Sequence, residues 1–127
     1  MSALPRPTES ELAILQILWE NGPSTVRFVN ETLNKEREVG YTTTLKLMQI
    51  MAEKGLVLRN TDSRTHIYRP AISEPETQRG LLDKFVDTAF RGSAIKLVMQ
   101  ALGQHQASRE ELDAIKAMIE AKEKDKQ

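Results

Sequence analysis

The sequence predicts a mainly α-helical fold with one small β-hairpin, and three observations support this prediction. Apolar residues recur at the helical spacing of three and four positions over several stretches. Capping boxes, in which a Ser or Thr is followed three residues later by Glu, open two of these stretches at residues 8–11 and 108–111. Residues 56–70 instead hold two short extended runs on either side of a turn. The predicted order is therefore three helices, a hairpin and three more helices.

The first two predicted helices supply apolar residues for a core. The first begins at the capping box Thr8-Glu9-Ser10-Glu11, ends at Asn21-Gly22-Pro23 and carries the apolar residues Leu12, Ala13, Leu15, Ile17, Leu18 and Trp19. We interpret Trp19 as a core residue and not as a ligand-stacking one, because an aromatic in an apolar helix is usually packed. The second helix is expected to be capped by Ser24 and to bury Val26, Val29 and Leu33. A charged linker at residues 35–38 follows it.

The third predicted helix has one buried side and one polar side. Its buried side follows the i, i+3, i+4, i+7 spacing at Thr44, Leu47, Met48 and Met51. The opposite side presents Thr42, Lys46, Gln49 and Glu53. A packed back and a polar front suit insertion into the major groove of DNA. The alternative is an amphipathic helix whose polar side simply faces water.

A β-hairpin is predicted directly after this helix. Gly55 ends the helix, residues 56–59 and 65–69 form the strands, and residues 61–64 have the composition of a turn. Between residues 41 and 70 there are five Lys or Arg against two acids, whereas the whole chain has 18 of each sign. This local basic excess favours a DNA-facing winged helix-turn-helix. The alternative is an ordinary hairpin with solvated arginines.

Several short motifs, taken together, are typical of one protein family. They are Leu12-x-x-Leu15-x-x-Leu18-Trp19, Gly22-Pro23, Tyr41-Thr42-Thr43, Glu53-Lys54-Gly55-Leu56-Val57 and Tyr68-Arg69-Pro70. With this pattern the chain resembles, over nearly its whole length, the penicillinase-repressor family of bacterial transcription regulators, the BlaI/MecI/CopY type. The resemblance implies a homodimeric winged-helix repressor that binds palindromic operators. It also implies, as a partner, a membrane sensor-protease that triggers cleavage and release.

The C-terminal third is expected to form three further helices. The first begins at Ser73-Glu74-Pro75-Glu76, Gly92-Ser93 separates it from the second, and the Ser108 capping box opens the third. These helices offer more apolar surface than they can bury alone, so we expect them to pair with a second copy of the chain. The alternative is that they fold back on the first domain. The predicted dimerisation residues are Leu82, Phe85, Val86, Ala89, Phe90, Ile95, Val98, Leu102, Leu112, Ile115 and Ile119.

The predicted organisation is a winged-helix DNA-binding domain at residues 1–72, a helical dimerisation segment at 73–122 and a disordered tail at 123–127. Within the first domain, we expect some side chains to approach base edges and others to contact phosphates, with Lys46 open to either role. The predicted DNA-binding residues are Tyr41, Thr42, Thr43, Lys46, Gln49, Arg59, Arg64 and Arg69. A second function stays open, a winged-helix module that binds protein and never touches DNA.

Composition excludes several other classes. The absence of cysteine removes disulfides and thiolate metal sites, and departs from the cysteine cluster of the copper-responsive branch. His66 and His105 lack metal-ligand spacing, and no catalytic motif or cofactor loop appears, so we expect neither an enzyme nor a cofactor. No apolar run is long enough to span a bilayer, and no leader-like segment precedes the first helix. We therefore expect a cytoplasmic location.

The resemblance is incomplete at one functional position. Relatives released by proteolysis have an Asn-Phe pair in the middle C-terminal helix. Alignment of the Leu97-Val98 pair places Gln100-Ala101 there in this sequence. The cleavage mechanism and its link to β-lactams are therefore not implied for this chain.

Overall fold

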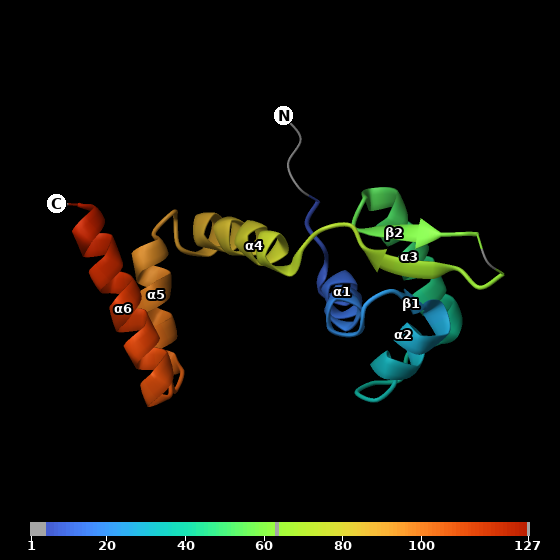
Figure 1. Cartoon of the computed structure of the whole chain (residues 1–127), viewed down its shortest axis with the longest axis horizontal. Helices are drawn as coiled ribbons and strands as arrows, with labels where there is room; N and C mark the ends of the chain where they lie inside the picture. The colour runs from blue at the N-terminus through green and yellow to red at the C-terminus, as the bar shows by residue number, and fades with distance from the viewer. Residues whose placement is uncertain (1–4, 63, 127) are drawn as a thin grey trace. The chain divides into compact units, whose positions relative to one another are not determined.

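Six helices and three short strands make up residues 5–62 and 64–126, which the structure, a computed structural model, describes (Figure 1). They are α1 (Glu9–Asn21), β1 (Ser24–Thr25), α2 (Val26–Leu33), α3 (Tyr41–Lys54), β2 (Val57–Asn60), β3 (Ile67–Pro70), α4 (Glu74–Ala89), α5 (Ala94–Gln104) and α6 (Arg109–Asp125). The order confirms the predicted mainly helical fold class.

The chain divides into two compact units between Asp83 and Lys84, inside α4. We call them the N-terminal unit and the C-terminal unit. The predicted boundary lay earlier, between residues 72 and 73. Ile72, just before α4, and Thr77, in its first turn, are both buried, so buried residues continue past the predicted boundary to the start of α4. No helix in residues 5–62 or 64–126 combines the length and the apolar character needed to cross a membrane.

Helix α1 begins and ends where the sequence indicated. The Thr8 hydroxyl accepts a hydrogen bond from the Glu11 N–H at 3.2 Å, and Glu11 Oε1 accepts one from the Thr8 N–H at 2.9 Å. This reciprocal pair satisfies two N–H groups that the helix itself leaves free. At the other end, Gly22 has a φ of 82°, a conformation that favours glycine. Trp19 is partly buried against the core, and its indole N–H donates to the Ile72 carbonyl at 3.0 Å.

The core of the N-terminal unit lies between α1, α2, α3 and the sheet. Its fully buried members include Ile14, Leu15, Leu18, Val29, Met48, Met51, Leu56 and Tyr68. Burial of one such aliphatic side chain stabilises the fold by roughly 1.5–3 kcal/mol. The buried side of α3 contains Thr44, Met48 and Met51 as predicted, while Leu47 is only partly buried.

The sheet has one strand more than predicted. Strand β1 pairs with β3 in the antiparallel register Ser24 to Tyr68 and Thr25 to Ile67, which gives the order β1-β3-β2. The prediction that Ser24 caps α2 is therefore wrong. Ser24 lies in the strand and its hydroxyl donates to the Gly22 carbonyl, while Thr25 caps the helix by accepting from the Phe28 N–H at 3.1 Å. We refer to the β2–β3 hairpin as the wing; it projects beyond the three helices beside it (Figure 1).

The buried hydroxyl of Tyr68 gives a first testable prediction. Among the residues described, no group forms a hydrogen bond with it, although the side chain is fully buried. A desolvated hydroxyl without a partner costs free energy, so Tyr68→Phe should leave the free energy of unfolding unchanged or raise it by up to about 1 kcal/mol. Urea titration measures this, with Tyr41→Phe at an exposed position as the control. A clear loss of stability in Tyr68→Phe alone would contradict the prediction.

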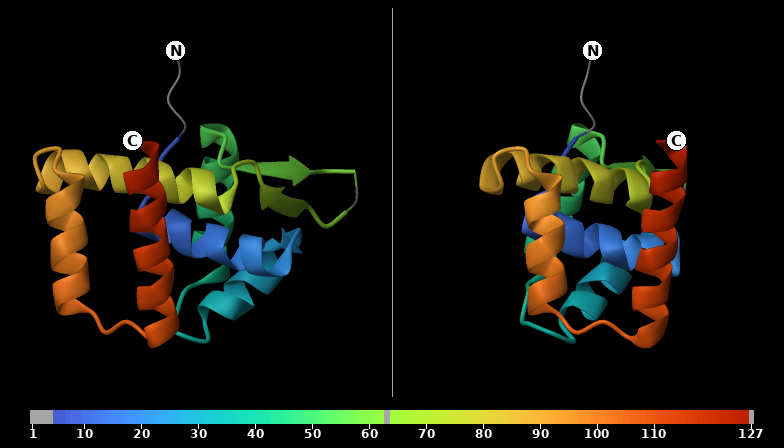
Figure 2. Two further views of the ribbon diagram at one scale, coloured as in Figure 1. Left: turned by 60° about the vertical axis from the view of Figure 1, so that its left-hand side comes forward. Right: turned by 90° about the vertical axis from the view of Figure 1, so that its left-hand side faces the viewer.

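The C-terminal unit contains α5 and α6, which run in opposite directions and stand apart in both views of Figure 2. Ser93 caps α5 by accepting from the Lys96 N–H, and the predicted capping box of Ser108 and Glu111 opens α6. The prediction of a disordered tail at 123–127 is wrong for residues 123–125, which belong to α6. Lys122 and Lys124 in the last turn favour the helix, since they lie near its negative end. Residue 127 of that tail lies outside the described residues.

Candidate nucleic-acid interface

Asn30 on α2 fixes the start of α3. Its side-chain amide donates to the Thr44 hydroxyl and to the Val39 carbonyl, both at 2.9 Å. Asn34 closes the linker between the helices, because its amide nitrogen donates to the Val39 carbonyl and its amide oxygen accepts from the Val39 N–H. These contacts connect α2 to the buried side of α3. They hold the helix-turn-helix pair in one geometry.

The end of α3 is anchored to α1 by an ion pair. Lys54 Nζ donates to Glu11 Oε1 at 2.7 Å, and the Glu11 side chain is only 3% exposed. Burial by itself raises the pKa of the Glu11 carboxyl. The hydrogen bonds and charge of Lys54, together with the bonds from Thr8, outweigh burial and lower the pKa below its ordinary 4.5. Glu11 is therefore an ionised, buried carboxylate that holds the last turn of α3.

All eight predicted DNA-binding side chains are exposed, but the structure divides them into separate groups. Thr42, Lys46 and Gln49 lie on α3 opposite its buried residues, and Thr43 lies on the flank of the same helix. Gln49 and Arg59 line one cavity together with Ala52 and Glu53, so the side chain at 59 lies beside α3. This joins one predicted wing arginine to the predicted base-reading face.

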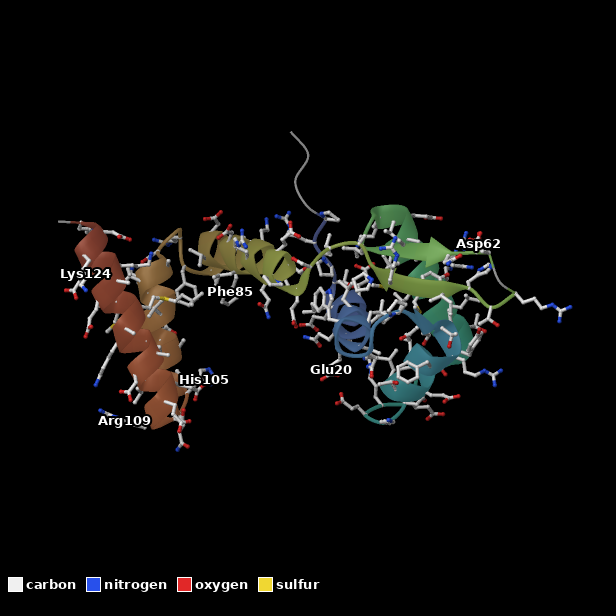
Figure 3. All side chains as sticks on the ribbon, viewed as in Figure 1. Glu20, Asp62, Phe85, His105, Arg109 and Lys124 are labelled. Carbon is white, nitrogen blue, oxygen red and sulfur yellow. The ribbon has the colours of Figure 1, made fainter. Side chains whose placement is uncertain are left out.

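Arg69 lies on the other face of the sheet from Arg59. In the antiparallel register Arg59 pairs with Tyr68, and Leu58 pairs with Arg69. Paired residues point to the same face of the sheet, and successive residues of a strand point to opposite faces. Arg69 therefore shares its face with exposed Leu58. A second cavity, beside Asp62 in the turn of the wing (Figure 3), is lined by Leu58, Arg69 and also Arg59. Arg59 and Arg69 therefore leave opposite faces of the sheet, yet both contribute to the cavity at the turn of the wing.

The third predicted wing arginine, Arg64, lines a cavity with Tyr41 at the start of α3. Residues 25–27 and 64–66 complete this cavity, so Arg27 and His66 belong to the same basic region. Arg27 was not among the predicted DNA-binding residues, although it lines this cavity. The pairing of β1 with β3 brings it there, and a two-residue strand gives no periodic pattern in the sequence.

The predicted dimerisation residues are mostly exposed in the single chain. Neither α5 nor α6 contains a buried residue, and Ile95 is 71% exposed. Exposed Met99 and Met118 extend the apolar stripes and were missed, although they lie at helical spacing from Ile95 and Ile115. Val86 differs, because it is already buried within its own chain. Phe85 (Figure 3) packs edge-on against Phe90, with ring centroids 5.6 Å apart.

Metal ligands do not cluster in the part of the chain that the structure describes, where no group of three His, Cys, Asp or Glu could hold an ion. His66 lies beside the start of β3 and His105 in the loop between α5 and α6 (Figure 3). The predicted DNA-binding residues of α3 and the wing offer hydroxyl, amide, ammonium and guanidinium donors, which suit a polyanion.

Comparison with known proteins identifies the family. The family model described as penicillinase repressor matches residues 7–121. The chain belongs to the penicillinase repressor family. One relative, the transcriptional regulator BlaI of Mycobacterium tuberculosis, is 34% identical over 112 residues, covering 84% of this chain and 81% of the relative. The penicillinase repressor of Bacillus licheniformis is 21% identical over 120 residues, 94% of each chain.

Solved structures confirm the winged-helix fold of this penicillinase repressor family member. The solution structure of the DNA-binding domain of the repressor BlaI superposes with a TM-score of 0.52 at 21% identity, covering 60% of this chain and 93% of that one. The monomeric form of Bacillus licheniformis BlaI, in complex with the blaP half-operator, gives a TM-score of 0.51 with the same identity and coverage. Members of the family are transcriptional repressors and not enzymes, which confirms the expectation that this chain is no enzyme.

Proposed function

We propose that this penicillinase repressor family member represses transcription by inserting α3 into the major groove of an operator. The observation that carries the proposal is the exposed polar face of α3, held on a helix whose other side is buried. A major groove admits an α-helix, and the side chains on this face suit its edges. Gln forms hydrogen bonds with adenine and Lys with guanine. The hydroxyl of Thr can form a hydrogen bond with a base edge, and its methyl group can pack against the methyl group of thymine.

Charge favours DNA over a protein partner. The winged region has a local basic excess, whereas the chain as a whole has a formal net charge of +0. Arg59 lies beside the C-terminal part of α3, and Arg64 lies beside its start. Phosphate contacts supply most of the affinity of such domains and fix their register on the duplex. The complex of Bacillus licheniformis BlaI with its half-operator supports the same role for this chain.

The proposal includes a homodimer formed through the C-terminal unit. Helices α5 and α6 hold exposed apolar stripes at Ile95, Val98, Met99 and Leu102 and at Leu112, Met118 and Ile119. Helices with one apolar stripe bury it against another element, and neither α5 nor α6 contains a fully buried residue in the single chain. A second copy of the chain supplies a matching surface, and two copies also suit a palindromic operator.

The base-reading face can be tested in the full chain. Alanine at Thr42, Thr43, Lys46 and Gln49 together should abolish the preference for operator over random duplex, since each base contact contributes roughly 1–3 kcal/mol. The measurement is fluorescence anisotropy with DNA from upstream of its own coding sequence. The control replaces four exposed polar residues of the C-terminal unit with alanine, namely Thr88, Gln100, Gln104 and Lys116. Retained selectivity in the α3 variant would show that α3 does not read bases.

Release from DNA is proposed to follow from loosening the dimer, by cleavage or by partner binding in the C-terminal unit. The sensor-protease as a partner comes from the resemblance alone, because where relatives released by proteolysis have the Asn-Phe pair, this chain has Gln100-Ala101. Both residues are exposed and lie within α5, so a protease needs local unfolding of that helix to reach the bond. A cytoplasmic location, where operator DNA is accessible, belongs to the same proposal.

A further inference from the structure

One basic cavity lies outside the base-reading face of α3. It has a volume of about 300 Å³ and is lined by residues 25–27, residues 64–66 and Tyr41. Three different parts of the chain therefore meet there, namely the start of α2, the start of α3 and the residues of the wing that directly precede β3. The pairing of Thr25 with Ile67 sets their spacing, because it holds β1 against β3.

The charges of this cavity are not compensated within the described chain. Its lining includes Arg27, Arg64 and His66 and no acid. Neither arginine forms an ion pair with a described carboxylate. The first turn of α2 contains no acidic residue, and Thr25 takes up the Phe28 N–H. The cavity therefore presents two guanidinium groups, a phenol and the positive end of a helix to solvent.

We infer that this cavity binds one backbone phosphate of DNA and that Arg27 is its principal ligand, with Arg64 opposite. Guanidinium groups bind phosphate oxygens in pairs of parallel hydrogen bonds, and Arg27 and Arg64 reach the cavity from different elements. Tyr41 directly precedes Thr42 and Thr43 on α3, so a phosphate held here fixes the depth and register of the base-reading residues. The inference rests on the proposed function, because the phosphodiester belongs to the operator.

Arg27→Gln in the full chain tests this assignment. The slope of log affinity against log salt should flatten by about 0.9 for each half-site occupied. The factor by which Arg27→Gln binds more weakly than the wild type should therefore shrink about threefold per half-site between 50 and 200 mM salt. Operator and random duplex should lose affinity by similar factors, since a phosphate contact carries no base information. Arg27→Lys should recover most of the salt slope, because it retains the charge.

The matched control is Arg37→Gln, which removes the same charge from the exposed turn after the far end of α2. Operator duplexes with one neutral methylphosphonate at a time then locate the contact. At one position of the duplex, the methylphosphonate should lower the affinity of the wild type but should not lower the affinity of Arg27→Gln any further. If Arg27→Gln and Arg37→Gln have the same salt slope and the same methylphosphonate profile, the cavity does not bind phosphate. If the wild type itself fails to prefer operator, the proposed function fails and the inference with it.

Free phosphate is the other source of the same chemistry. Inorganic phosphate should not protect the protein against thermal unfolding at millimolar concentration, because two guanidinium groups on an open surface need the neighbouring contacts of a duplex. A phosphate-dependent rise in Tm that Arg27→Gln abolishes would overturn the assignment to DNA.

Discussion

Replacement of Ile95 by Asp should convert the proposed dimer to a monomer and lower the affinity of the protein for a two-half-site operator by about 10²–10⁴-fold. Ile95 is 71% exposed in the single chain, so the substitution should leave the fold of that chain intact. In a dimer the same side chain becomes buried, and a desolvated carboxylate there strongly opposes pairing. Sedimentation velocity and operator titration measure the two effects.

Gln100→Asp is the matched control for Ile95→Asp. It introduces the same charge on the same helix but on the side opposite the apolar stripe, and Gln100 is exposed. This variant should remain dimeric and bind normally. If Ile95→Asp also stays dimeric and sensitive to half-site spacing, the C-terminal unit is not the dimerisation element.

Lys54→Met should cost about 2 kcal/mol of the free energy of unfolding at pH 7. The substitution leaves the buried Glu11 carboxylate without its cation, a change that costs 3–5 kcal/mol where both partners are fully buried. Lys54 is 36% exposed, so water screens the pair and reduces the loss. Urea titration gives the difference, and Lys46→Met, at an exposed position of the same helix, should cost much less.

The pH dependence supplies the second half of this prediction. The pKa of Glu11 is lowered in the folded state, so its stabilising contribution is complete above the unfolded value near 4.5 and is lost as the pH falls through the folded value. The gap between wild type and Lys54→Met should therefore narrow as the pH falls below 4.5, because the carboxyl becomes protonated. A gap that is constant from pH 7 to pH 3 would show that the pair does not act through the ionised carboxylate.

Local patterns predicted much of this fold. The capping boxes at Thr8 and Ser108 and the αL glycine at position 55 depend on residues within four positions of each other, so each helix end can be found without tertiary information. The buried side of α3 follows in the same way from helical spacing. Once the buried side of α3 is assigned, the same helical spacing also assigns its exposed polar face.

Features that depend on distant contacts were missed. Strand β1 has two residues, and only its pairing with β3, more than 40 positions later, makes it a strand. Arg27 enters the basic cavity through that pairing. Arg59 and Arg69 belong to different strands and point to opposite faces of the sheet. Alternation along each strand follows from the sequence, but the relation between the two strands required the register that the structure supplies.

Trp19, the one tryptophan of the chain, gives the protein a built-in reporter. Its indole is hydrogen-bonded to Ile72 within the N-terminal unit, so its fluorescence emission follows the unfolding of that unit. Far-UV circular dichroism instead sums over the helices of both units. Coincident melting curves from the two signals therefore mean that both units unfold as one cooperative system, and separated curves mean that each unfolds by itself.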